Sequence, residues 1–293
     1  MGTVVEASAI ATAADDQPLG ALALADAAAR ACMEKAHRAP DDVHLLISAG
    51  VYLDRNTSEP AIAALIQEDI DANVEPEPGG GQGTFSFDIR NGACGLLTGI
   101  ELVDGLLASG TIQAGMVVAT DADPEPGVTE GFWFPALGGA VMLSADGARR
   151  GFTRFRSATF PEYAQLFSST IDWRAENGNG RNVLTVEIAD DYPARVLECA
   201  EKTARDVASA DGLDLGEVGA LFATASTPGF GHALAERLGI PPNRAASLPD
   251  GLGRAHTAGL AAALESLALA EAGTALLVSA GAGITVAAAV YRG

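Results

Sequence analysis

The chain alternates between long blocks rich in alanine and leucine and short, uninterrupted apolar runs. The long blocks predict helices, and the short runs predict strands that are buried on both faces, as in a mainly parallel sheet. We predict helices over residues 21–37, 60–71, 94–109, 194–210, 232–238 and 257–272. We predict strands over residues 43–49, 84–89, 116–120, 140–144, 218–223, 275–279 and 284–291.

The second half of the chain repeats the order of the first. The apolar run 43–47 matches 218–222, and the segment 94–110 with its following strand matches 257–273 with its following strand. An internal duplication of a strand–helix unit accounts for this correspondence. We therefore predict an α/β fold of two pseudo-equivalent halves, residues 1–150 and 151–293, with layered sheets around paired central helices.

Residues 274–291 carry no charge and resemble a membrane span in hydropathy. Gly281, Ala282 and Gly283 interrupt this stretch near its middle. Because glycine punctuates secondary structure, two buried strands joined by a tight turn explain the stretch better than one helix.

Composition indicates a globular protein with an acidic surface. Hydrophobic residues make up 48% of the chain, and the formal net charge is -20, which disfavours binding to nucleic acid or to an anionic membrane. The three cysteines do not suggest a disulfide framework, and the N-terminus lacks the pattern of a signal peptide. We expect a reducing cytoplasmic location.

Cys94 lies between the strand-like run that ends at Ile89 and a helix-like run that begins at Gly95. A thiol at the N-terminus of a helix has a lowered pKa and becomes a nucleophile, and Gly92 and Gly95 allow a sharp turn there. The alternative is a buried structural cysteine, which is what a single cysteine usually is.

Several segments resemble the β-ketoacyl-acyl-carrier-protein synthase III family, which has the thiolase fold, and together they cover nearly the whole chain. The segments are 87–95 with Val103-Asp104 and Ser109-Gly110, the strand 117–121, the helix end 235–240 and the C-terminal residues 276–293. The resemblance implies that Cys94 accepts an acyl group from a thioester. It also implies an oxyanion hole from the Cys94 N–H and one N–H of the turn 281–283, assigned to Ala282; the alternative for that turn is a simple hairpin.

Several departures from the family pattern bear on activity. Counting along the chain places Thr224 at the family's histidine position and Arg254 at its asparagine position, and neither side chain supplies the same hydrogen bonds to a malonyl thioester. The segment 134–140 lacks the family's acidic residue. The segment 12–20 is too short to match the family's long coenzyme A-gripping segment.

Other side chains have open roles. Arg254 could stabilise a thiolate or bind a carboxylate, or it could be a surface arginine. His256 could act as an alternative base or could be a solvated helix start, and His232 is a weaker candidate. The arginines 149, 150, 154 and 156 could dock an acidic carrier protein, although an exposed strand face explains them better.

Two functions remain open. In the favoured one, the protein is an acyltransferase of fatty-acid-like or polyketide-like specialised biosynthesis that works through Cys94 without efficient malonyl decarboxylation, paired with an intact homologue. In the alternative, it is a catalytically silent structural or regulatory subunit of an active ketosynthase. The resemblance implies a homodimer or a heterodimer, acyl carrier protein as a possible partner, and no metal or permanently bound cofactor. The expected substrate is an acyl thioester of carrier-protein phosphopantetheine or of coenzyme A.

Overall fold

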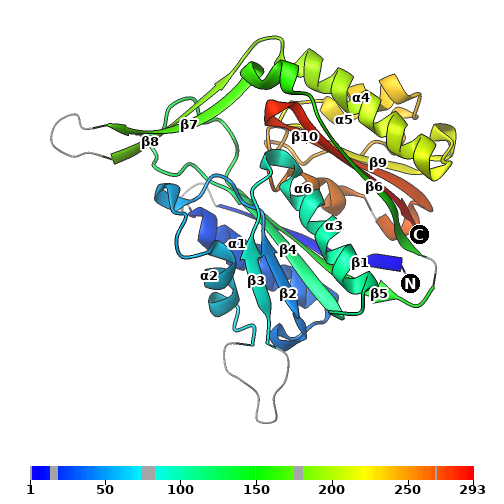
Figure 1. Ribbon diagram of the computed structural model, residues 1–293, viewed down its shortest axis with the longest axis horizontal. Coiled ribbons are helices and arrows are strands. Elements are labelled where there is room, and N and C mark those ends of the chain that lie inside the picture. Colours follow the sequence, from blue (N-terminus) through cyan, green and yellow to red (C-terminus); the bar gives the residue numbers. More distant parts are fainter. Residues whose placement is uncertain (1, 14–18, 74–82, 149, 175–180, 268) are drawn as a thin grey trace.

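The computed structural model describes residues 2–13, 19–73, 83–148, 150–174, 181–267 and 269–293. Within these residues, two sheets face each other across a central pair of helices, and further helices cover the outer face of each sheet (Figure 1). Short 3₁₀ turns link the elements at Pro40–Asp42, Asp54–Asn56, Gly92–Cys94, Pro161–Leu166, Leu215–Glu217, Pro242–Arg244, Leu269–Glu271 and Ala282–Ile284.

The first sheet comes from the N-terminal part of the chain and has the order β1-β5-β4-β2-β3. Strands β4, β2 and β3 are parallel, whereas β5 is antiparallel to both β4 and β1. Its strands are β1 (Gly2–Thr12), β2 (Leu45–Ser48), β3 (Phe85–Asp88), β4 (Ala114–Asp121) and β5 (Leu137–Asp146). Its helices are α1 (Ala21–Ala36), α2 (Ile62–Asp69) and α3 (Gly95–Ala108).

The second sheet comes from the C-terminal part and has the order β6-β11-β10-β9. Strands β9 and β10 are parallel, and β11 is antiparallel to both β10 and β6. Its strands are β6 (Gly151–Thr159), β9 (Ala220–Thr224), β10 (Thr274–Gly281) and β11 (Thr285–Arg292). Its helices are α4 (Tyr192–Asp211), α5 (Phe230–Leu238) and α6 (Gly259–Ser266).

Strand alternation distributes the apolar side chains between the layers. Leu45 and Ile47 of β2 join the central core around α3 and α6, whereas Leu46 between them packs in the outer core under α1 and α2. Because successive residues of a strand point to opposite faces, an unbroken apolar run is needed where both faces are covered. Burial on both faces is confirmed for β2, β4 and β9, whereas the predicted strand 84–89 forms β3, an edge strand with no buried residue.

The uncharged stretch 274–291 forms the two strands β10 and β11 joined by a glycine-containing turn, as predicted. No helix in the described part of the chain is both long enough and apolar enough to cross a membrane. The division into halves at residue 150 stays a prediction.

The elements differ from the predicted pattern in several places. Strand β1 was not predicted, and β6 was considered only as an exposed strand face that holds Arg154 and Arg156. The helix predicted over 257–272 ends at Ser266, because Leu267 adopts an extended conformation. A two-stranded ribbon of β7 (Phe167–Arg174) and β8 (Arg181–Ile188) was not predicted and projects from the body of the molecule (Figure 1). Its strands carry polar residues on both faces, so they lack the apolar run that marks the other strands.

Candidate functional site

Cys94 ends the 3₁₀ turn Gly92–Cys94 and immediately precedes α3. Gly92 adopts a φ of 51°, a left-handed conformation that favours glycine and lets the chain turn sharply from β3 into the helix. The Cys94 side chain is fully buried, and its sulfur lies 3.1 Å from the carbonyl oxygen of Ser279 and 3.3 Å from that of Thr285. The thiol therefore donates its hydrogen to the backbone of β10 and β11.

This environment opposes ionisation of the thiol. Burial raises the pKa of Cys94 to about 12 and outweighs a backbone hydrogen bond with Ala287 that lowers it. The expectation of a lowered pKa at the helix N-terminus is wrong, because the cost of burying a charge exceeds the stabilisation from the helix dipole. The two neighbouring carbonyl oxygens accept hydrogen bonds only, so they stabilise the neutral thiol.

The residue that faces the glycine-containing turn 281–283 is Ala93. A Cβ atom placed on Gly281 would lie 3.1 Å from the Ala93 nitrogen and 3.2 Å from its Cβ. The methyl group of Ala93 therefore packs against the turn 281–283, at the place where a reactive side chain would meet that turn. The Cys94 side chain points into the core instead. The Cys94 N–H, predicted as an oxyanion donor, already donates to the Asn91 carbonyl at 3.0 Å. The oxyanion role of Ala282 stays a prediction.

Thr224 lies at the end of β9 and pairs in register with Ser279 of β10. Both hydroxyl groups are buried, and neither has a hydrogen-bond partner in the described structure. Thr224 thus reaches the strand whose Ser279 carbonyl accepts from Cys94. No described group accepts a hydrogen bond from the Thr224 hydroxyl or donates one to it. The structure therefore shows no base for the thiol at the position of Thr224.

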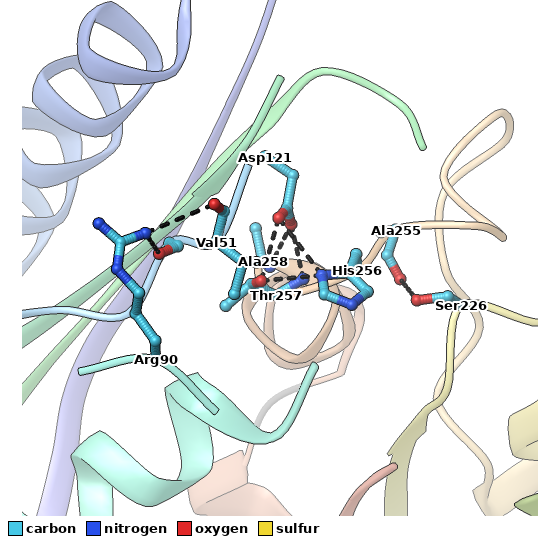
Figure 2. A network of polar contacts seen from close by, with 9 residues as sticks. Val51, Arg90, Asp121, Ser226, Ala255, His256, Thr257 and Ala258 are labelled. Atoms are coloured by element: carbon cyan, nitrogen blue, oxygen red, sulfur yellow. Dashed lines mark hydrogen bonds and ion pairs between the residues drawn. The ribbon is translucent and has the colours of Figure 1, made fainter. Parts of the chain in front are cut away.

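His256 is buried and belongs to a polar network at the start of α6 (Figure 2). Its Nδ1 lies 3.0 Å from Thr257 Oγ1 and 3.4 Å from Asp121 Oδ1. The Asp121 carboxylate also accepts hydrogen bonds from the Thr257 N–H at 2.6 Å, the Thr257 hydroxyl at 3.0 Å and the Ala258 N–H at 3.3 Å. The alternative of a solvated helix start is therefore wrong for His256.

The His256 ring also packs among aromatic side chains, with ring centroids 5.1 Å from Tyr52, 4.9 Å from Phe134 and 6.1 Å from Phe167. Its other edge faces the turn before Cys94, since a Cβ on Gly92 would lie 4.0 Å from its Cε1 and Nε2. Sequence reasoning gave Asp121 no role. The available signal was an acidic residue directly after the apolar strand 116–120.

The remaining candidates lie away from Cys94. Arg254 is exposed, and its guanidinium lies 5.6 Å from the centroid of the Trp133 ring, so its position gives no support for a role in stabilising a buried thiolate. Arg150 pairs with Asp146 at 2.8 Å. Arg154 and Arg156 are exposed on β6, and residue 149 lies outside the described residues.

Two cavities reach residues of this region. A cavity of about 170 Å³ is lined in part by Thr224 and His232, and one of about 430 Å³ is lined in part by Tyr52 and Arg90. Among the described residues, Cys94 lines neither cavity. The described residues also contain no group of three or more His, Cys, Asp or Glu side chains arranged to hold a metal ion.

Neither a protein-family model nor a curated protein sequence matches the chain. Solved structures match along its whole length. The 3-oxoacyl-(acyl-carrier-protein) synthase III of Pseudomonas aeruginosa is 19% identical, with a TM-score of 0.82 over 100% of this chain and 98% of that one. The corresponding Aquifex aeolicus enzyme is 18% identical, with a TM-score of 0.78 over 100% of both chains.

A third match is OleA from Xanthomonas campestris with bound lauric acid and lauroyl-CoA. It is 16% identical, with a TM-score of 0.78 over 100% of this chain and 99% of that one. These likenesses establish the fold, and the predicted thiolase fold is confirmed.

Proposed function

We propose that this chain is a catalytically silent, ketosynthase-III-like subunit that assembles with an intact homologue in acyl metabolism. One observation carries the proposal. The only cysteine next to the expected catalytic turn is fully buried, has its pKa raised to about 12 and donates to two backbone carbonyls. A thiol must ionise and meet its substrate to act as a nucleophile, and this one is held from doing either.

The open edge of the first sheet supports a subunit role. Strand β3 is the last strand of that sheet in the described structure, and Phe85 on it is 63% exposed. Edge strands with exposed apolar residues are templates for pairing with another chain. A second copy of this chain would give a homodimer, and an intact homologue would give a heterodimer.

Acyl transfer through Cys94 remains the second candidate. The position of Cys94 directly before α3 and the burial of His256 beside the same turn favour it. This function requires a conformational change that exposes the sulfur to an acyl thioester of a carrier protein or of coenzyme A.

Acylation separates the two candidates. The purified protein and its Cys94→Ala variant are incubated with a panel of acyl thioesters, and intact mass and peptide mapping are recorded. We expect no adduct on Cys94, and condensing activity only when a partner that carries the missing histidine and asparagine is added. A stoichiometric adduct on Cys94 that is absent from the variant would establish the second candidate.

The reactivity of the thiol provides an independent prediction. At about pH 8, a pKa of about 12 in place of 9.0 leaves roughly 1,000-fold less thiolate. We expect iodoacetamide to label Cys94 in the native protein at least that much more slowly than in guanidinium. The rate should rise about tenfold per pH unit while the fold persists.

The same pKa shift gives a sign for stability. Because the folded pKa lies above the unfolded one, this contribution is fully present below about pH 9 and is lost as pH rises towards 12. Peptide mapping over this pH range measures the rate at which iodoacetamide labels Cys94. Equal labelling rates in the native and the denatured protein would contradict the burial of the thiol.

A further inference from the structure

The cavity of about 430 Å³ lies between the ribbon of β7 and β8, the loop after β2, and Arg90, which follows β3. Tyr52, Ile171 and Leu184 contribute apolar surface to it, and Thr57 and Asn182 contribute hydroxyl and amide groups. Arg90 is the only charged residue among its lining residues in the described structure. Its volume is in the range typical of sites for small organic ligands.

The guanidinium of Arg90 is only partly used by the protein. Its Nη1 lies 3.4 Å from the Gly50 carbonyl and 3.5 Å from the Val51 carbonyl, which are long contacts to neutral acceptors. Figure 2 shows the other two nitrogens turned away from these carbonyls. In the described structure Nε and Nη2 have no hydrogen-bond partner. That edge has the geometry that binds both oxygens of a carboxylate.

The acidic residues next to Arg90 in sequence and in the loop after β2 have other partners. Asp88 accepts from the N–H groups of Ile62 and Ala63 at 2.9 and 2.7 Å, at the start of α2. Asp54 accepts from the Ala21 N–H at 2.8 Å, at the start of α1. These carboxylates serve the helix N-termini, where negative charge is favourable. Arg90 consequently has no carboxylate within ion-pair distance in the described residues, although the chain is strongly acidic.

The loop that forms one wall of the cavity is held in an uncommon conformation. Arg55 and Asn56 have φ values of 54° and 53°, two consecutive left-handed residues other than glycine. Such conformations cost free energy and tend to persist where the surrounding structure holds them at a functional site. This strained turn directs the chain so that Asn56, Thr57 and Ser58 face the cavity.

We propose that this cavity binds small carboxylic acids with an apolar body. The carboxylate of the ligand is held by a bidentate ion pair with the guanidinium of Arg90. The carboxylate meets the free edge of the guanidinium, and the body packs against Tyr52, Ile171 and Leu184. Hydroxyl and amide groups complete the hydrogen bonds around the head group. The site takes a free acid rather than a thioester and does not involve Cys94, so the inference stands whichever proposed function is correct.

Isothermal titration calorimetry with hexanoate, butyrate and phenylacetate tests the site, with 1-hexanol and phenylacetamide as uncharged analogues. We expect hexanoate to bind about 15-fold more tightly than butyrate, because each buried methylene group contributes about fourfold in affinity. The uncharged analogues should bind at least about tenfold more weakly than the matching acids. Cys94→Ala should bind as the unchanged protein does.

Substitution of Arg90 gives the decisive comparison. Arg90→Gln should weaken carboxylate binding at least about tenfold without changing the affinity for the uncharged analogues, and Arg90→Lys should lose less. Arg154→Gln, an exposed arginine on β6, is the matched control for net charge and should change binding less than about twofold. Circular dichroism and the unfolding midpoint establish that both Arg90 variants are folded.

The proposal is overturned by any of three results. These are absence of carboxylate binding up to about 10 mM, equal affinity for acids and uncharged analogues, and equal losses in Arg90→Gln and Arg154→Gln. The last would show a general electrostatic effect rather than a site.

Discussion

Replacing Asp121 with alanine is expected to lower the free energy of unfolding by about 3–5 kcal/mol. The carboxylate is buried and accepts hydrogen bonds from the Thr257 N–H, the Thr257 hydroxyl and the Ala258 N–H. Its loss leaves the N–H groups of Thr257 and Ala258 without this acceptor in the centre of the molecule, and the Thr257 hydroxyl and His256 Nδ1 keep only each other as partners. Urea unfolding followed by circular dichroism measures the change.

Asp123 provides the matched control for this substitution. Its carboxylate is half-buried in the loop after β4 and accepts from the Glu125 N–H at 3.1 Å. Asp123→Ala should therefore cost about 1 kcal/mol or less. Asp121→Asn, which keeps one acceptor oxygen, should fall between the two. If Asp121→Ala were no more destabilising than Asp123→Ala, the network at the start of α6 would not be an organising element of this fold.

Gly138→Ala is expected to destabilise the protein by about 3 kcal/mol or more. A Cβ atom at this position of β5 would lie 2.2 Å from the Leu24 carbonyl oxygen and 2.7 Å from the Leu24 carbonyl carbon. Both atoms belong to the backbone of α1, so the helix itself has to move away from the sheet. A rotamer change in one side chain does not relieve this contact, as it would in an ordinary overpacked core.

Gly105→Ala tests the same chemical change without the contact. Gly105 is exposed within α3, and a Cβ atom there would have no neighbour within 4 Å. Alanine at this position should stabilise the protein by about 0.5–1 kcal/mol through helix propensity. Equilibrium unfolding of the two variants should give opposite signs. Similar small effects would show that α1 does not pack on β5 through Gly138.

The position of Cys94 shows that a difference of one residue along the chain decides whether a side chain meets the turn 281–283 or is buried in the core. Ala93 and Cys94 are neighbours in the same 3₁₀ turn, yet the methyl group of Ala93 meets Gly281 while the Cys94 thiol reaches the carbonyls of Ser279 and Thr285. Consecutive residues of a tight helical turn point in different directions. A helix N-terminus lowers the pKa of a thiol only where water or a substrate shares the site, and here the core surrounds it.

The pattern of apolar positions was sufficient to predict most elements of both sheets and their helices. The exceptions are β1, β6, the ribbon of β7 and β8, and the C-terminal end of α6. Buried strands and amphipathic helices have distinct periods, which local sequence carries directly. The ribbon lacks such a signal, because Ile171 and Trp173 are exposed and its stability depends on neighbouring segments.

The candidate site was predicted only in part, because a side chain's neighbours come from distant segments. The sequence located Cys94 at the turn into α3 and Thr224 at the end of β9, and it raised His256 as a candidate. It did not show that the Cys94 thiol donates to a backbone carbonyl 185 residues further along the chain. Nor did it show that the Asp121 carboxylate accepts from the Thr257 hydroxyl, 136 residues away. Counting along the chain favoured Arg254 for the position beside the thiol, whereas packing leaves Arg254 exposed on Trp133 and places His256 in the interior.

By itself, the sequence determined most of the strands and helices, the acidic surface and the layered α/β architecture, because hydrophobic periodicity and charge are local properties of the chain. Only the tertiary structure decided that the Cys94 thiol is neutral, that His256 is bound to Asp121, and that Arg90 faces a cavity without an acidic partner. Ionisation, hydrogen bonding and access depend on which distant backbone and side-chain atoms surround a group, and folding alone brings those atoms together.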